Sequence, residues 1–150
     1  MPRLLLLPLI AITLFLACAP PAFAARQFIL QPLCTTSSDR RLSTSALILA
    51  LQRKRWIIRG ADLNTGQVEA RNCRGRTCYT VNAWVDDKGT VAITGKRRES
   101  NREVSSRPPR NWVRHLKHAF EGYSCYEPEA IENLMAEHHY PPYRDLPPAK

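Results

Sequence analysis

The positions of the cysteines constrain this chain more than any other feature of its sequence. Beyond residue 24 there are four, Cys34, Cys73, Cys78 and Cys125. An even number of cysteines in a small exported protein predicts a disulfide framework, and four cysteines allow three connectivities. We favour Cys73 with Cys78, because residues 74–77 have the composition of a hairpin loop and directly opposed residues of an antiparallel pair can be bridged. The remaining pair, Cys34 with Cys125, then ties the N-terminal segment to the end of the last core helix.

Two other uses of these thiols suit the spacing less well. A four-cysteine zinc site needs two closely spaced pairs, and only Cys73 and Cys78 are near each other in the chain. A redox-active pair usually has Cys-x-x-Cys spacing at the start of a helix, whereas four residues separate Cys73 from Cys78. We therefore predict two structural disulfides, and we predict neither a metal site nor a cofactor.

Residues 1–24 have the organisation of a secretory signal peptide. Arg3 precedes an apolar run over 4–17 that is short for a membrane span, and Ala22-Phe23-Ala24 forms a small-x-small cleavage site. After cleavage at Ala24, no later stretch is apolar enough to predict a transmembrane segment. We therefore expect a periplasmic or secreted protein, the alternative being an N-terminal helix that is retained as an anchor.

Cys18 offers a rival form of export, because bacterial lipoproteins are cleaved just before a cysteine that then carries the lipid. Ala17 suits the position before that cysteine, but the bulky Phe15 and Leu16 depart from the usual pattern of small residues. We favour a mature chain that begins at Ala25, with lipidation at Cys18 as the alternative.

Hydrophobic periodicity predicts the order of helices and strands. A short strand over 27–30 precedes a helix over 40–52, whose apolar residues recur three and four apart on a wide buried face. Strands are expected from residue 56, over 67–72, over 79–85 and over 90–94. The alternation over 79–85 is the clearest, and Asp86 to Gly89 predicts the turn that follows it.

The second half of the chain predicts a second amphipathic helix and a separate C-terminal region. Residues 96–107 are polar and basic and are expected to form a connection. Pro108 and Pro109 then open a helix on which Trp112, Leu116 and Phe120 recur at helical spacing. We predict one disulfide-stapled α+β domain over 25–126, an antiparallel sheet packed against two helices, followed over 127–150 by a short acidic helix and a proline-rich, mobile tail.

The positive charge is unevenly distributed along the chain. The formal net charge is +9, but residues 25–120 hold 19 basic and seven acidic side chains, whereas residues 121–150 hold two basic and six acidic ones. A cluster of this sign attracts phosphate and carboxylate groups. The predicted basic patch lies on the connection and the helix after it, and consists of Arg97, Arg98, Arg102, Arg107, Arg110 and Arg114.

Part of the sequence resembles a known group of proteins. The matching stretch runs over about 46–123, and its characteristic residues are Trp56, Gly66, Ala70, Val81, Ser100-Asn101 and Asn111-Trp112-Val113. Their order is similar to that of small, exported, mostly proteobacterial proteins of unknown function, many of them lipoproteins. The family has a helix ending near a Trp, a three-strand meander and a helix that opens on an Asn-x-Trp-like motif.

This sequence also departs from the family pattern. Thr77 stands where a His is expected, and arginine-rich sequence replaces the tyrosines and glycines usual before the last helix. The resemblance implies a fold and a compartment, and it implies no activity.

The function that we favour from the sequence is non-enzymatic. The charge predicts a module that binds an anionic envelope component or a partner protein through the basic patch. Nucleic acid is not expected as a partner, because the chain is exported and has no aromatic-interleaved single-strand platform. The alternative is a small, nuclease-like secreted hydrolase that uses His115, His118 and Lys117. A solvated helix face explains the same three residues, and the alternative requires them to converge in a concave site.

Overall fold

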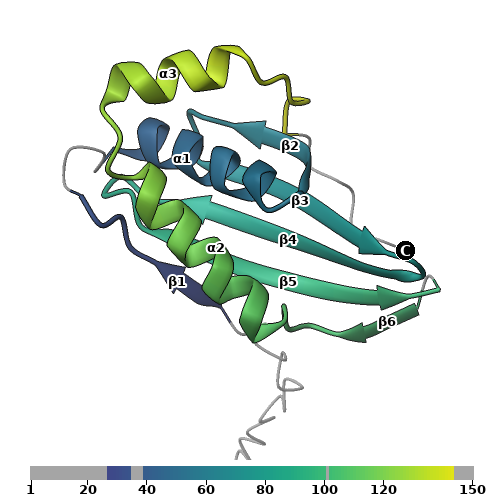
Figure 1. The fold of residues 1–150 in the computed structure, drawn as a ribbon. Helices are drawn as coiled ribbons and strands as arrows, with labels where there is room; N and C mark the ends of the chain where they lie inside the picture. Colours follow the sequence, from purple (N-terminus) through teal and green to yellow (C-terminus); the bar gives the residue numbers. More distant parts are fainter. Residues whose placement is uncertain (1–26, 35–38, 101, 144–150) are drawn as a thin grey trace, which may run out of the picture.

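The computed structural model describes residues 27–34, 39–100 and 102–143. These residues form a six-stranded antiparallel sheet with three helices on one of its faces (Figure 1). The elements are, in chain order, β1 Phe28–Leu30, α1 Arg40–Arg53, β2 Ile57–Asp62, β3 Gln67–Arg74, β4 Thr77–Val85, β5 Val91–Glu99, β6 Arg102–Ser105, α2 Arg110–Tyr123 and α3 Pro128–Ala136. The predicted α+β class is confirmed.

Strands β2 to β5 form an antiparallel meander, and both β1 and β6 pair with β5. The expectation of a polar connection over 96–107 is wrong, because β5 continues to Glu99 and β6 folds back along it. Lys96 and Glu103 form an ion pair of 3.7 Å across this hairpin. The end of β5 is rich in charged residues and lacks hydrophobic alternation, so its sequence did not indicate a strand.

Helix α1 lies at the centre of the helical layer and contacts α2, α3 and strands β2 to β4. All nine residues from Ser43 to Leu51 are buried, although the sequence predicts only one wide buried face. The buried hydroxyls of Thr44 and Ser45 donate to the carbonyls of Arg40 and Arg41, at 2.6 and 3.0 Å. These local hydrogen bonds let polar residues occupy a helix that is covered on several sides.

The hydrophobic core lies between the sheet and the helices. Phe120 on α2 is completely buried, and Ile131 on α3 is buried as well. The sheet contributes the residues that alternate toward the helices, namely Ile58, Val68, Ala70, Val81, Ala83, Val85, Val91 and Ile93. The opposite face of the sheet carries exposed apolar side chains among the described residues, including Ile29, Ile57 and Trp84.

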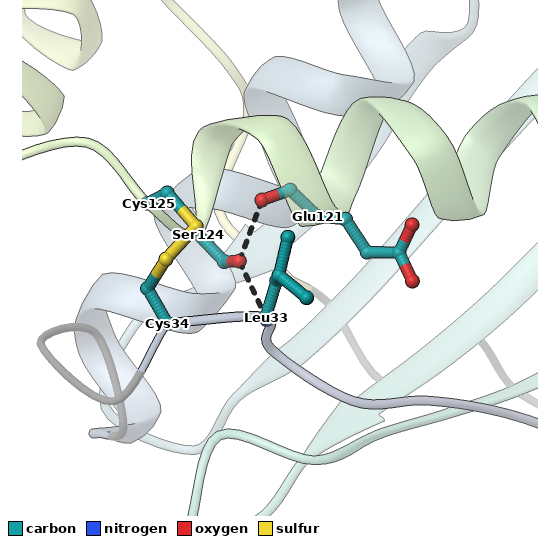
Figure 2. Close-up of a disulfide and its surroundings, with 5 residues drawn as sticks. All are labelled: Leu33, Cys34, Glu121, Ser124 and Cys125. Carbon is teal, nitrogen blue, oxygen red and sulfur yellow. Dashed lines mark hydrogen bonds between the residues drawn. A yellow bond between two sulfur atoms is a disulfide. The ribbon is translucent and has the colours of Figure 1, made fainter.

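Both predicted disulfides are confirmed. Cys73 and Cys78 are directly opposed residues of β3 and β4 with Cα atoms 4.1 Å apart, and Cys34 and Cys125 have Cα atoms 4.9 Å apart. Figure 2 shows how the second bridge is supported by Ser124, whose side chain is buried next to it. The Leu33 N–H donates to Ser124 Oγ at 2.9 Å, and this hydroxyl donates to a carbonyl in the last turn of α2 at 2.8 Å.

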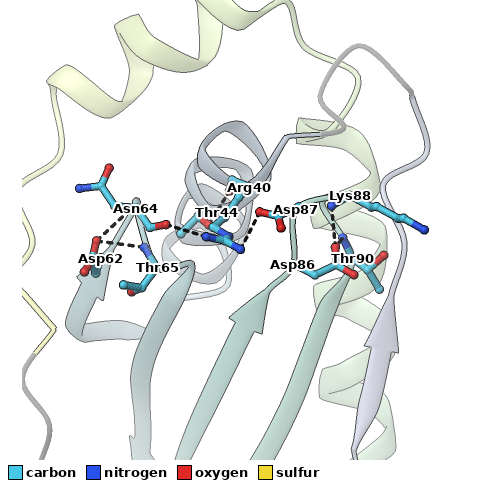
Figure 3. Close-up of polar contacts among 9 residues, drawn as sticks. All are labelled: Arg40, Thr44, Asp62, Asn64, Thr65, Asp86, Asp87, Lys88 and Thr90. Carbon is cyan, nitrogen blue, oxygen red and sulfur yellow. Dashed lines mark hydrogen bonds and ion pairs between the residues drawn. The ribbon is translucent and has the colours of Figure 1, made fainter.

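The turn between β4 and β5 lies where the sequence predicts it, and Asp86 organises it (Figure 3). Its carboxylate accepts from the N–H groups of Lys88 and Thr90, at 2.9 and 2.8 Å. The next residue, Asp87, forms an ion pair of 2.6 Å with Arg40 at the start of α1. This contact joins the turn to the helical layer.

The turn between β2 and β3 is built in the same way. The Asp62 carboxylate accepts from the backbone N–H groups of Asn64 and Thr65, and these hydrogen bonds hold the pKa of Asp62 below its ordinary value. Arg40 donates to the Asn64 carbonyl at 3.1 Å. Arg40 therefore connects two neighbouring turns of the sheet to the first turn of α1 (Figure 3).

The start of the proline-rich tail is attached to the edge of the sheet. The sequence predicts a mobile tail over 138–150, but within its described part the Ala61 N–H donates to the Pro141 carbonyl and the Tyr143 N–H donates to the Ala61 carbonyl, both at 3.0 Å. A Cβ atom at Gly60 would lie 2.9 Å from Tyr143 Cα, so glycine permits this close approach. Residues 144–150 lie outside the described residues.

Candidate functional site

The candidate site is a pocket of about 410 Å³ between the end of α1, the end of β3 and the first turns of α2. Its lining residues come from three separate parts of the chain. They are Lys54, Trp56, Asn72, Arg74, Asn111, Trp112 and His115, and we call this hollow the Trp112 pocket. Two indoles, two amides and three basic side chains therefore surround one concave space.

The chain reverses direction at the end of α1 to bring Lys54 and Trp56 to this pocket. The Arg55 N–H donates to the Gln52 carbonyl at 2.8 Å, and the Trp56 N–H donates to the Leu51 carbonyl at 3.0 Å. This pair of bonds is the Schellman pattern, in which the residue at the Arg55 position is usually glycine. Arg55 has φ +62°, a left-handed conformation that costs an L-residue about 1–2 kcal/mol. The strain is located at the rim of the pocket.

Replacing Arg55 with glycine is expected to raise the free energy of unfolding by about 0.5–1 kcal/mol. Glycine adopts the left-handed conformation without steric cost, and part of that gain is offset by its larger entropy in the unfolded chain. Urea unfolding measures the change. The control is Arg53→Gly, within the last turn of α1, which should lower the free energy of unfolding by about 1 kcal/mol. If both variants change the free energy of unfolding in the same direction, Arg55 is not strained.

Aromatic rings fix the walls of the pocket. The rings of Trp56 and Trp112 pack edge to face with centroids 5.3 Å apart, and the ring of Tyr79 lies 4.4 Å from that of Trp112. The Arg74 guanidinium is 5.6 Å from the Trp112 centroid, and that of Arg97 is 5.9 Å from the Tyr79 centroid. These contacts are in the range of cation–π interactions. They hold the Arg74 side chain at the pocket before any ligand arrives.

The pocket is electrostatically positive because its lining contains Lys54 and Arg74 and no carboxylate. Among the described residues, ion pairs involve Arg40, Lys96, Arg97, Lys117 and His118, and none reaches Lys54 or Arg74. The Asn72 amide nitrogen donates to the Arg55 carbonyl at 3.3 Å, which turns its amide oxygen away from that carbonyl. The site therefore offers two permanent cations that have no acidic partner in the described part of the chain.

The predicted basic patch is spread over several surfaces. Arg97 and Arg98 are successive residues of β5 and so point to opposite faces of the sheet. Arg97 lies on the helical side, where it contacts Tyr79 and pairs with Glu99, whereas Arg98 is opposite Cys78. The remaining members lie on β6, in the loop before α2 and on α2 itself, namely Arg102, Arg107, Arg110 and Arg114. Their role in binding stays a prediction.

The three residues of the hydrolase alternative do not meet in one cavity. His115 lines the Trp112 pocket. Lys117 Nζ and His118 Nδ1 instead lie 3.6 and 3.5 Å from the Glu121 carboxylate, further along the exposed side of α2. The converging geometry that the alternative requires is therefore not formed by these side chains.

Sequence reasoning missed the pocket as a site. Lys54 is far in the sequence from Asn72 and Arg74, and the strand that carries these two residues has no motif. No sequence spacing therefore indicated that the three side chains meet. A signal was present in the family resemblance, because Trp56 and Asn111-Trp112 are among its characteristic residues and all three line the pocket.

Comparison with the models of known protein families and with the sequences of curated proteins finds no match to this chain. The resemblance to exported proteobacterial proteins therefore stays a prediction.

Two further observations concern the described residues alone. Within 27–34, 39–100 and 102–143, no group of three or more His, Cys, Asp or Glu side chains could hold a metal ion. In the same ranges, no helix combines the length and apolar character needed to cross a bilayer.

Proposed function

We propose that this protein is an exported, non-enzymatic binding module that captures an anionic group of an envelope component or a partner protein in the Trp112 pocket. The observation that carries the proposal is a concave site with Lys54, Arg74 and His115 in its lining and no carboxylate among them. The two disulfides support a chain that matures in an oxidising compartment.

The pocket has the features that favour binding of an anion. The Arg74 guanidinium is planar and offers several N–H donors in a fixed fork, and its contact with Trp112 reduces the conformational freedom lost on binding. Lys54 adds a second charge from the C-cap of α1. Hydrogen bonds to charged groups contribute about 1.5–3 kcal/mol each. Two such residues therefore account for a measurable affinity without any catalytic step.

A charge-matched pair of variants tests the proposal. The oxidised protein over 25–150, carrying Trp84→Phe so that tryptophan fluorescence reports the two pocket indoles, is titrated with lipopolysaccharide at low salt. Lys54→Ala with Arg74→Ala is expected to weaken binding at least tenfold. The control is Arg59→Ala with Lys88→Ala, which removes the same charge at two exposed positions outside the pocket, and it should stay within about threefold.

Two results would contradict the pocket as the binding site. Equal losses in both double variants would assign the binding to net charge. A loss confined to Arg98→Ala with Arg102→Ala would assign it to the basic patch predicted from the sequence.

A further inference from the structure

We infer that the group recognised by the Trp112 pocket is a phosphate monoester carried on a hydroxylated ring, such as a sugar phosphate. The inference rests on the proposed function and names the ligand class of the same site.

The charge of the pocket matches a dianion better than a monoanion. Lys54 and Arg74 are both cationic at neutral pH and have no acidic partner among the described residues. A carboxylate would neutralise one of them and leave the other unpaired. A phosphate monoester carries a charge of about −1.5 to −2 at pH 7 and offers three acceptor oxygens, which suit a guanidinium fork and an ammonium together.

The amides indicate that the ligand carries hydrogen-bond donors as well. Asn72 uses one N–H of its amide to bind the Arg55 carbonyl, which leaves its acceptor oxygen and a second N–H for other partners. Asn111 adds a second amide to the lining. A phosphate dianion cannot donate to these oxygens, whereas a hydroxyl group can. The part of the ligand next to the phosphate is therefore expected to be hydroxylated.

The size and the aromatic wall point to a ring. The pocket of about 410 Å³ lies within the range of roughly 300–1,000 Å³ that is usual for small-molecule sites, and it exceeds what a single oxyanion would occupy. The half-buried Trp112 contributes apolar indole surface to the lining, and such surface can contact the C–H groups of a saccharide. Phosphate, hydroxyl groups and a ring face thus each have a matching group in the lining.

The test compares four soluble probes on the Trp84→Phe protein, namely glucose 6-phosphate, glucuronate, inorganic phosphate and glucose. Glucose 6-phosphate is expected to bind at least tenfold more tightly than each of the others. Asn72→Leu should weaken glucose 6-phosphate at least fivefold and leave inorganic phosphate within twofold. The matched control Asn133→Leu, at an exposed position of α3, should change neither.

Each contrary result has a distinct meaning. Glucuronate binding as tightly as glucose 6-phosphate would overturn the phosphate assignment, and inorganic phosphate binding as tightly would overturn the ring assignment. Either result would leave the proposed anion-binding function in place, provided that Lys54→Ala with Arg74→Ala still weakens binding at least tenfold. If that double variant binds every anion normally, the proposed function itself fails.

An experiment with lipid vesicles tests whether the pocket accepts a membrane-bound sugar phosphate as well as a soluble one. Vesicles that carry monophosphoryl lipid A present a phosphate monoester on a membrane-bound sugar, and glucose 6-phosphate should displace the protein from them. Displacement supports one site that accepts both soluble and lipid-borne sugar phosphates. Vesicle binding that glucose 6-phosphate cannot displace would place lipid recognition elsewhere and overturn the assignment for the membrane-bound source.

Discussion

Replacing Cys34 and Cys125 together with serine is expected to lower the free energy of unfolding by about 4 kcal/mol. The bridge joins residues 91 positions apart, and in the loop-entropy model closure of a loop of that length restricts the unfolded chain strongly. Urea unfolding measures the change for the variant and for the oxidised parent protein. The dependence of the unfolding free energy on urea concentration is fitted separately for each protein.

The second disulfide provides the matched control for the first. Cys73 and Cys78 are only five positions apart, so the same model gives a contribution of about 2 kcal/mol. Serine at both of these positions should therefore cost about half as much as serine at Cys34 and Cys125. Equal losses, or a larger loss from the short loop, would contradict the entropic account of the long bridge.

Phe120→Ala is expected to destabilise the protein by about 3–5 kcal/mol. The ring is completely buried where α2 meets the core, and its removal loses transfer free energy and leaves a cavity. Thermal or urea unfolding monitored by circular dichroism measures the loss. Phe120 does not line the Trp112 pocket, so the folded fraction of the variant should keep its affinity for anions.

Ile57→Ala serves as the control for Phe120→Ala. Ile57 is a large apolar residue on β2, but 67% of its surface is exposed, so its truncation should change the free energy of unfolding by no more than about 0.5 kcal/mol. Similar losses for the two variants would show that the core does not lie between the sheet and α2.

The parts of the fold that the sequence predicted are those with a strong local pattern. The alternation of β4 and the amphipathic spacing of α2 each reflect one buried face and one exposed face, and the turn at Asp86 reflects the hydrogen bonds that its carboxylate accepts from the backbone. The pairing of Cys73 with Cys78 followed from the same logic, because the hairpin register places them opposite each other. These patterns are visible within a few residues.

The parts that were missed depend on contacts between distant segments. The burial of Ser43 to Ser45 on α1 arises because other elements cover the helix on several sides, which periodicity within α1 does not indicate. The attachment of Tyr143 to Ala61 depends on glycine at position 60, which by itself indicates only a flexible backbone. The Trp112 pocket was missed for the same reason, since the turn after α1, strand β3 and helix α2 each contribute only two or three of its residues.

The bridge between Cys34 and Cys125 also determines how the molecule responds to cutting. It closes a covalent ring that contains α1, β2 to β6 and α2, and therefore every lining residue of the Trp112 pocket. A single peptide-bond cleavage at any point between these cysteines opens the ring but releases no fragment. Helix α3 lies outside the ring and is joined to it by one stretch of backbone, so a single cut after Cys125 can remove it. In a compartment that contains proteases, all the segments that line the pocket thus remain covalently linked after a first cut inside the ring.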